Sequence, residues 1–278
     1  MHDPRQLPFL LKLLEDESPS VRQSVYQQLI AFGPSLEAEL VRADLRLTSR
    51  ELEGVREWIR ERSREWLRAA WPSWMNEPDP YTQMEAALNL LAEFQEDRYR
   101  PGKTHALLDE LAEECRATYG TPSTRDLSSF LFRVKDLQGA REDYYNPLNS
   151  SLVFAIEKRR GIPISLVSIY MLVGRRLGLT IEGCNFPGHF LALAREPEAT
   201  LVIDCYNGGL VIDNAILSRY FDPVSVTVED LLRLRATTPT IVSRVLRNLI
   251  NAYRATAQPR DLELIEELIG SLSAASQN

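Results

Sequence analysis

One histidine and one aspartate in the second half of the chain lie where a short β-hairpin could bring them together. His189 begins the run HFLALAR, Asp204 lies in the run LVIDCY, and EPEA forms a tight connection between the two. Alternation along paired strands places both side chains on one side of the hairpin. A carboxylate that orients an imidazole is half of a nucleophilic catalytic site, because it sets the tautomer and stabilises the imidazolium. We therefore predict a His189–Asp204 pair.

A nucleophile would complete such a site. It is expected at a helix N-terminus, where unpaired amides and the helix dipole stabilise negative charge. Gly161-Ile162-Pro163 precedes the apolar segment ISLVSIYMLVGRRLG, which predicts a helix over 164–177 with Ser165 in its first turn. Ser165 is therefore a candidate nucleophile with His189 as its base. The alternative is that Ser165 is an ordinary capping residue.

The three cysteines are weaker candidates for the nucleophile. Cys184 lies five residues before His189 and could be a displaced nucleophile, but a cysteine in a strand is more typical of a small buried hydrophobe. Cys115 and Cys205 fit apolar positions of a helix and a strand, so we assign both to the core. An odd number of widely spaced cysteines does not predict a disulfide framework.

The elements that position these residues are mostly helical. Apolar periodicity and capping residues predict α+β architecture, with one small antiparallel sheet built from the runs TIEGCNF, HFLALAR, LVIDCY and LVID. The helices are expected at 7–14, 19–32, 48–70, from 80, 103–119, 123–134, 150–159, 164–177 and 228–235, with two more in 240–276 separated near Pro259.

The N-terminal helices resemble a single HEAT-type repeat in the string LLEDESPSVRQSVYQQLIAFG. One such repeat cannot bury its own apolar face, so it must pack on other parts of the chain or bind a partner. A helical brace and a partner-binding surface both remain open. The spacing of Thr48 and Glu51 predicts a capping box, and the turn-rich WPSWMNEPDP is a candidate boundary.

The bulk composition excludes several classes of protein. A net charge of −7 does not indicate a basic surface for nucleic acid, and no apolar stretch is long enough to span a bilayer. The N-terminus lacks the features of a signal peptide, so we expect a cytoplasmic protein. Three histidines, and three cysteines without a CxxC pair, indicate no structural metal site, and no organic cofactor is indicated.

Several spaced motifs together resemble the transglutaminase-like superfamily. More narrowly, YYNPLNSSLVFAIEKRRGIPISLVSIYMLVGRRLGL, followed by NFPGHFLALA and VIDCYNGG, resembles the bacterial SirB-type family. That family shares its core with a region of certain eukaryotic F-box proteins. The resemblance covers about residues 80–235 and is densest over 143–213. It implies a papain/transglutaminase-like core, in which a central helix packs on a small antiparallel sheet and Cys, His and Asp form a triad.

Matched position by position, the resemblance implies a degenerate triad. His189 takes the place of the histidine, Asp204 that of the aspartate, and Ser165 lies nearest to the cysteine position, since no cysteine occurs in 116–183. Two functions follow from this match. One is a regulatory or protein-interaction module with an unidentified protein partner, and the other is a hydrolase or acyl transferase acting on amide or ester bonds.

The resemblance also places the segment before the central helix close to the site. Tyr145 and Asn149 are therefore candidate pocket residues, and Cys184, close to His189 in sequence, is a third; core packing for Tyr145 and a turn or capping role for Asn149 are the alternatives. The expected organisation is a HEAT-like segment over 1–75, a transglutaminase-like core over 78–235 and C-terminal helices over 236–278.

Overall fold

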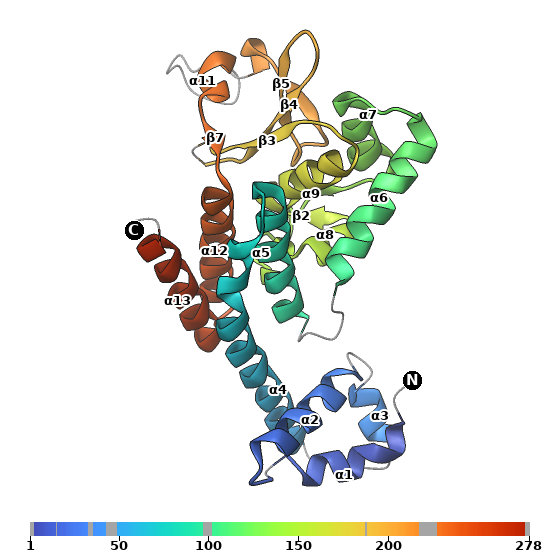
Figure 1. The fold of residues 1–278 in the computed structure, drawn as a ribbon, viewed down its shortest axis with the longest axis vertical. Coiled ribbons are helices and arrows are strands. Elements are labelled where there is room, and N and C mark those ends of the chain that lie inside the picture. Colours follow the sequence, from blue (N-terminus) through green and yellow to red (C-terminus); the bar gives the residue numbers. More distant parts are fainter. Residues whose placement is uncertain are drawn as a thin grey trace. The chain divides into compact units, whose positions relative to one another are not determined.

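The computed structural model describes residues 3–14, 16–32, 36–42, 49–96, 102–186, 188–216 and 227–275. The chain divides into two compact units (Figure 1). The first consists of residues 1–70 and 93–101, and the second of residues 71–92 and 102–278. Every residue singled out above for chemistry belongs to the second unit.

The described part of the first unit is helical. Its helices are η1 (Pro4–Gln6), α1 (Leu7–Lys12), α2 (Pro19–Ile30), α3 (Leu36–Arg42) and α4 (Ser49–Ala70). The apolar stripes of these helices share one core, and the Tyr26 and Ser63 hydroxyls meet inside it at 3.1 Å. The helices predicted over 7–14 and 19–32 are confirmed, α3 was not predicted, and the capping box predicted at Thr48 lies outside the described residues.

The second unit contains the remaining helices and all the strands that the structure describes. Its helical elements are η3 (Trp71–Asn76), α5 (Pro80–Gln95, whose last turn belongs to the first unit), α6 (Lys103–Tyr119), α7 (Thr124–Ser129), the π-helix η4 (Phe130–Val134), η5 (Pro147–Ser150), α8 (Leu152–Lys158), α9 (Pro163–Arg176), α11 (Val228–Leu232), α12 (Thr238–Ala255) and α13 (Pro259–Ala275). Capping boxes begin α7 at Ser123 and α11 at Thr227.

Helix α9 is the centre of this unit. Every residue from Ile164 to Gly174 is buried, which explains why this segment is apolar on all sides. Gly174 permits a close contact with the sheet, because a Cβ added there would lie 2.5 Å from Cδ1 of Ile181. A larger side chain at position 174 would require the Ile181 side chain or the helix to shift.

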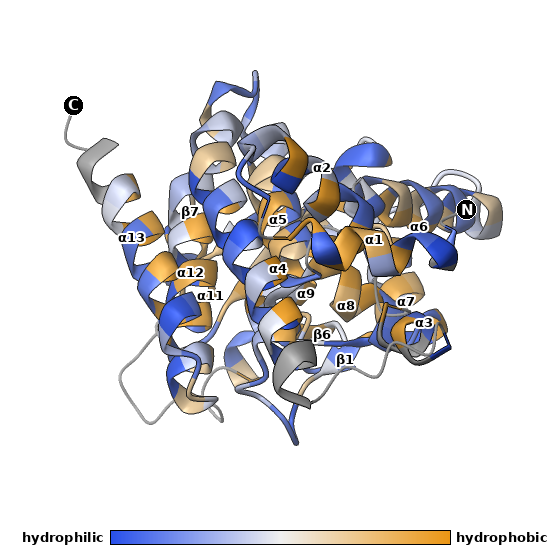
Figure 2. Cartoon of the chain, turned by 90° about the horizontal axis from the view of Figure 1, so that it is seen from below, coloured by the Kyte–Doolittle hydropathy of each residue, from blue (hydrophilic) through white to orange (hydrophobic). Residues whose placement is uncertain are grey.

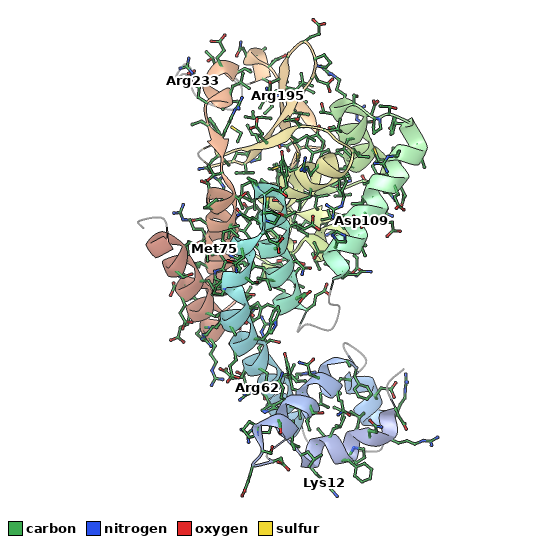
Figure 3. All side chains as sticks on the ribbon, in the orientation of Figure 1. Lys12, Arg62, Met75, Asp109, Arg195 and Arg233 are labelled. Atoms are coloured by element: carbon green, nitrogen blue, oxygen red, sulfur yellow. The ribbon has the colours of Figure 1, made fainter. Side chains whose placement is uncertain are left out.

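Arg176 anchors the C-terminal end of α9 to two other helices. Its guanidinium reaches both carboxylate oxygens of Glu85 on α5, each at 2.8 Å, and Oδ1 of Asp109 on α6 at 2.6 Å. Figure 3 labels Asp109 on α6. Burial alone would raise the pKa of Glu85, but the Arg176 and His105 contacts outweigh it and lower the pKa. One charged cluster therefore joins α9 to α5 and α6, which lie far before it in the sequence.

The main sheet has five antiparallel strands in the order β6-β5-β4-β3-β7. They are β3 (Ile181–Cys184), β4 (Leu191–Arg195), β5 (Thr200–Asp204), β6 (Leu210–Ile212) and β7 (Arg235–Ala236). Ile181 faces α9, whereas Cys184, on the opposite face by alternation, packs with Leu231 of α11. Helices α9 and α11 therefore cover opposite faces of the sheet (Figure 1).

The predicted α+β class and the antiparallel hairpin are confirmed. Strands β4 and β5 pair in the register Leu193 with Val202, and the connection is the predicted EPEA segment. The sequence did not predict β7, nor the short parallel pair β1 (Gln138–Gly139) and β2 (Arg160–Gly161), because two-residue strands carry no periodicity.

The C-terminal helices are also confirmed, with a break before Pro259. Both show hydrophobic and hydrophilic positions along their length (Figure 2). Among the helices of the described residues, none is both long enough and apolar enough to cross a lipid bilayer.

Candidate functional site

The imidazole of His189 and the carboxylate of Asp204 meet at one end of the main sheet. His189 lies in the loop that leads into β4, and Asp204 is the last residue of β5. The distance from His189 Nε2 to Asp204 Oδ2 is 3.0 Å, with the side chains 20% and 1% exposed. The ring nitrogen does not reach the oxygen with hydrogen-bond geometry, so the contact is an ion pair when His189 is protonated. The predicted proximity of the two groups is confirmed.

Asp204 is held by Asn207 as well as by His189. The backbone N–H of Asn207 donates to Oδ1 at 3.1 Å, and its side-chain Nδ2 donates to Oδ2 at 2.7 Å. Burial by itself raises the pKa of a carboxylate, but the contacts with His189 and Asn207 outweigh it, so the pKa of Asp204 is lowered. Asp204 is therefore ionised at neutral pH.

Aromatic side chains form a wall beside this pair. Tyr206 lies edge-on to the His189 ring with 6.2 Å between centroids, and Tyr144 lies edge-on to Tyr206 at 6.5 Å. Tyr145 continues the series at 5.5 Å from Tyr144 and is 56% exposed. Arg141 lies over Tyr206 and donates to Oδ1 of Asn207 at 2.7 Å. The wall thus connects the His189–Asp204 pair to the protein surface.

Ser165 lies in the first turn of α9, where the sequence predicts it, but its hydroxyl has a structural partner. The side chain is buried, and Oγ donates to the backbone carbonyl of Asn149 at 2.9 Å. Within the described residues, no hydrogen bond joins Ser165 to His189. The structure therefore brings two of the three triad positions into contact and leaves the third hydrogen-bonded elsewhere.

Asn149 connects Ser165 to the tyrosine wall. Its carbonyl accepts the Ser165 hydroxyl, while its side-chain amide donates to the backbone carbonyls of Asp143 and Tyr144. Asn149 is buried and has no open face toward a ligand. Of the two interpretations of Asn149, a pocket residue or a residue that holds a turn, the geometry favours the second.

This site lies in a segment that matches a known family. A model of the transglutaminase-like superfamily matches residues 102–247. The chain belongs to this superfamily.

Relatives agree with this membership. A UPF0162 protein of Xylella fastidiosa is 38% identical over 136 residues, which are 47% of this chain and 48% of that protein. A UPF0162 protein of Pseudomonas aeruginosa is 31% identical over 208 residues, 71% of this chain and 75% of that protein. The human F-box only protein 21 is 46% identical over 61 residues, 22% of this chain and 10% of that protein. This chain spans about half the length of its Xylella relatives, and no solved structure matches it.

The cysteines do not supply the thiolate that the transglutaminase-like triad is expected to use. Cys184 is fully buried under α11, donates to the carbonyl of Leu231, and has a pKa raised to about 12 by burial. Cys205 is also fully buried, and burial raises its pKa well above the usual range. Burial raises the pKa of Cys115 to about 11. Cys184 therefore belongs to the core beneath α11, which is the second of the two interpretations given above.

Sequence reasoning missed Arg244, which holds the loop that carries His189. Arg244 lies on α12, and its Nη2 donates to the His189 carbonyl at 3.0 Å. Its Nη1 donates to Asn185 Oδ1 at 2.6 Å and to the Phe186 carbonyl at 3.3 Å. The guanidinium also lies over the ring of Phe190. Nothing local in the sequence identifies this role, because Arg244 is 55 residues from His189.

Proposed function

We propose that this transglutaminase-like chain is a regulatory or protein-interaction module with a degenerate triad, in which Ser165 stands in place of the cysteine. One observation carries the proposal: Ser165 is 1% exposed, and its hydroxyl donates to the Asn149 carbonyl. A nucleophile must be reachable by its substrate and must pass its proton to a base within hydrogen-bond distance. The arrangement of Ser165 supports neither requirement.

The thiols support the same proposal. A cysteine nucleophile reacts as the thiolate, and thiolates form where positive charge and solvent lower the pKa. All three cysteines are buried free thiols with raised pKa values. Free thiols also suit the reducing cytoplasm, which we propose as the location of the protein.

The tyrosine wall supplies the surface that a partner would bind. Tyr144 and Tyr145 are 38% and 56% exposed, and Arg141 is exposed beside them. Tyrosine and arginine are enriched among the residues that dominate binding energy at protein interfaces. The buried amide of Asn149 holds the backbone on which Tyr144 sits, so this surface is preorganised.

The proposal includes the subfamily of the chain, the bounds of its segments and the class of its partner. We place the chain in the SirB-type branch of the superfamily and interpret residues 1–75 as a HEAT-like segment that offers a second binding surface. The transglutaminase-like core is assigned to 78–235 and the C-terminal helices to 236–278. The partner is a protein; no nucleic acid, membrane or cofactor takes part.

A second function, hydrolysis or acyl transfer at an amide or ester, is favoured by the acid–base pair itself. His189 directs Nε2 toward Asp204, and Nδ1 has no partner among the described residues. In that mechanism Ser165 would attack, His189 would take its proton and Asp204 would stabilise the imidazolium. The reaction requires the Ser165 hydroxyl to leave the Asn149 carbonyl.

Chemical labelling separates the two functions. Native protein is treated with a serine-directed fluorophosphonate and, separately, with a thiol alkylator, and the modified residues are identified by mass spectrometry. The module predicts no labelling at Ser165 and none at the three buried cysteines. Labelling at Ser165 that disappears in a His189→Ala variant would establish the hydrolase instead, and labelling at Cys184 alone would identify a displaced nucleophile.

Partner capture tests the proposed surface. Proteins retained from a native lysate by the wild type are compared with those retained by Tyr145→Ser and by Val134→Ser. Val134 is a matched control, because it is 58% exposed and lies outside the tyrosine wall. We expect a partner that is lost with Tyr145→Ser and kept with Val134→Ser; equal retention by both variants would contradict the assignment of this surface.

A further inference from the structure

A polar cavity borders the loop that carries His189. It has a volume of about 450 Å³ and is formed by the first turns of α12, one residue of α13 and Asn185. Its polar lining consists of Asn185, Thr240, Ser243, Arg244, Arg247 and Asn248. None of the described lining residues is acidic, so the cavity has two positive charges and no negative one.

The two arginines are only partly satisfied by the protein. Arg244 donates to one amide oxygen and two backbone carbonyls, and the described residues give it no carboxylate partner. Burial lowers the pKa of Arg244, and the positive charge of Arg247 adds to this effect. Arg247 is exposed and has neither a hydrogen bond nor an ion pair within the described residues. The two guanidinium groups are three positions apart on one helix and so share a face.

Neutral donors accompany these charges. The Ser243 hydroxyl and the Asn248 amide also lack hydrogen-bond partners in the part of the chain that the structure describes, and both line the cavity. A guanidinium presents its N–H groups in a planar fork that matches the oxygens of a phosphate or a carboxylate. A ligand with several acceptor oxygens and negative charge would therefore satisfy groups that the protein leaves open.

We propose that this cavity is a binding site for the phosphate monoester group of a small molecule, held by Arg244, Arg247, Ser243 and Asn248. A phosphate monoester carries a charge of about −1.5 to −2 at neutral pH, which balances two arginines, whereas a single carboxylate leaves one of them uncompensated. Arg244 also donates to the His189 carbonyl, so an occupied cavity would contact the transglutaminase-like site through this side chain. The proposal holds whether that site is catalytic or not.

Calorimetric titration with inorganic phosphate tests the site on the full chain. We expect saturable binding at one site per chain, and about ten-fold weaker binding by Arg247→Gln, because one charge-assisted hydrogen bond is lost. The matched control is Arg133→Gln, which removes a positive charge that is also exposed but lies outside the cavity. If both variants bound phosphate equally more weakly than the wild type, the effect would come from net charge alone and the proposal would be overturned. Absence of saturable phosphate binding by the wild type would also overturn it.

Further titrations identify the source of the group. O-phosphoserine and adenosine monophosphate carry the same phosphate monoester on an amino acid and on a nucleoside, and tighter binding of one than of inorganic phosphate would name the class of ligand. Acetate that binds as tightly as phosphate, with the same loss in Arg247→Gln, would show a carboxylate site and overturn the phosphate assignment. Because no step uses Ser165 or a thiol, failure here leaves the proposed function unaffected.

Discussion

Two histidine–carboxylate pairs in the second unit share their chemistry but not their surroundings. His189 lies 3.0 Å from Asp204 with the side chains 20% and 1% exposed, whereas His105 lies 2.7 Å from Glu85 with the side chains 69% and 17% exposed. Water screens the second pair, although its distance is shorter.

The carboxylates also differ in how they are satisfied. Glu85 is held chiefly by the bidentate contact with Arg176, so His105 is a secondary partner. Asp204 has no arginine among its described partners and depends on His189 and Asn207. The distance between an imidazole and a carboxylate therefore does not distinguish the two pairs, whereas burial and the absence of a second charged partner of the carboxylate among the described residues do.

The largest effect is expected from Asp204→Ala. The change removes the carboxylate beside His189 and leaves both buried donors of Asn207 without their acceptor, and we expect the free energy of unfolding to fall by about 3 kcal/mol. Urea denaturation measures the loss. Asp204→Asn is the matched control and should lose less, because its amide oxygen still accepts from Asn207. If the alanine variant had the same urea midpoint of unfolding as the wild type, Asp204 would contribute no more to stability than an exposed carboxylate.

A smaller effect is expected from the pH dependence of the same group. The pKa of Asp204 is lowered in the folded chain, so its ionised form stabilises the fold above its unfolded pKa of about 4, and this stabilisation is lost as the pH falls through the folded pKa. Urea midpoints of the wild type and Asp204→Asn, measured from pH 7 to pH 3, should converge at the acidic end. The other carboxylates are the same in both proteins, so their contributions cancel in the difference between the two midpoints. A difference that stays constant from pH 7 to pH 3 would refute the lowered pKa of Asp204.

The smallest effect is expected from His105→Gln. The His105 side chain is 69% exposed and Glu85 keeps both of its contacts with Arg176, so the free energy of unfolding should change by about 0.5 kcal/mol or less. Arg176→Met provides the contrast, because it leaves Glu85 half-buried without its main partner. A His105 effect as large as the Arg176 effect would erase the distinction between the two pairs.

Much of the fold was predictable because it depends on short-range patterns. Apolar periodicity located α6, α9, α12 and α13, and capping residues located the starts of α7 and α11. Alternation in the two runs around EPEA gave the hairpin, and with it the proximity of His189 and Asp204. These features require only neighbours in sequence and the geometry of one turn.

Close approaches between distant segments were not predictable in this way. Gly139 is an example: a Cβ there would lie 2.6 Å from the ring of Tyr206, so this glycine permits the tyrosine to reach its place beside His189. The sequence around Gly139 contains no pattern that names Tyr206 as its neighbour.

By itself, the sequence determined most of the helices, the hairpin and the proximity of His189 and Asp204 that the hairpin produces. The tertiary structure alone decided that the Ser165 hydroxyl is donated to a carbonyl 16 residues away and that an arginine 55 residues from His189 holds its loop. The physical reason is that backbone periodicity is set by local residues, whereas a side chain chooses its hydrogen-bond partner from whatever the packed chain brings within about 3 Å.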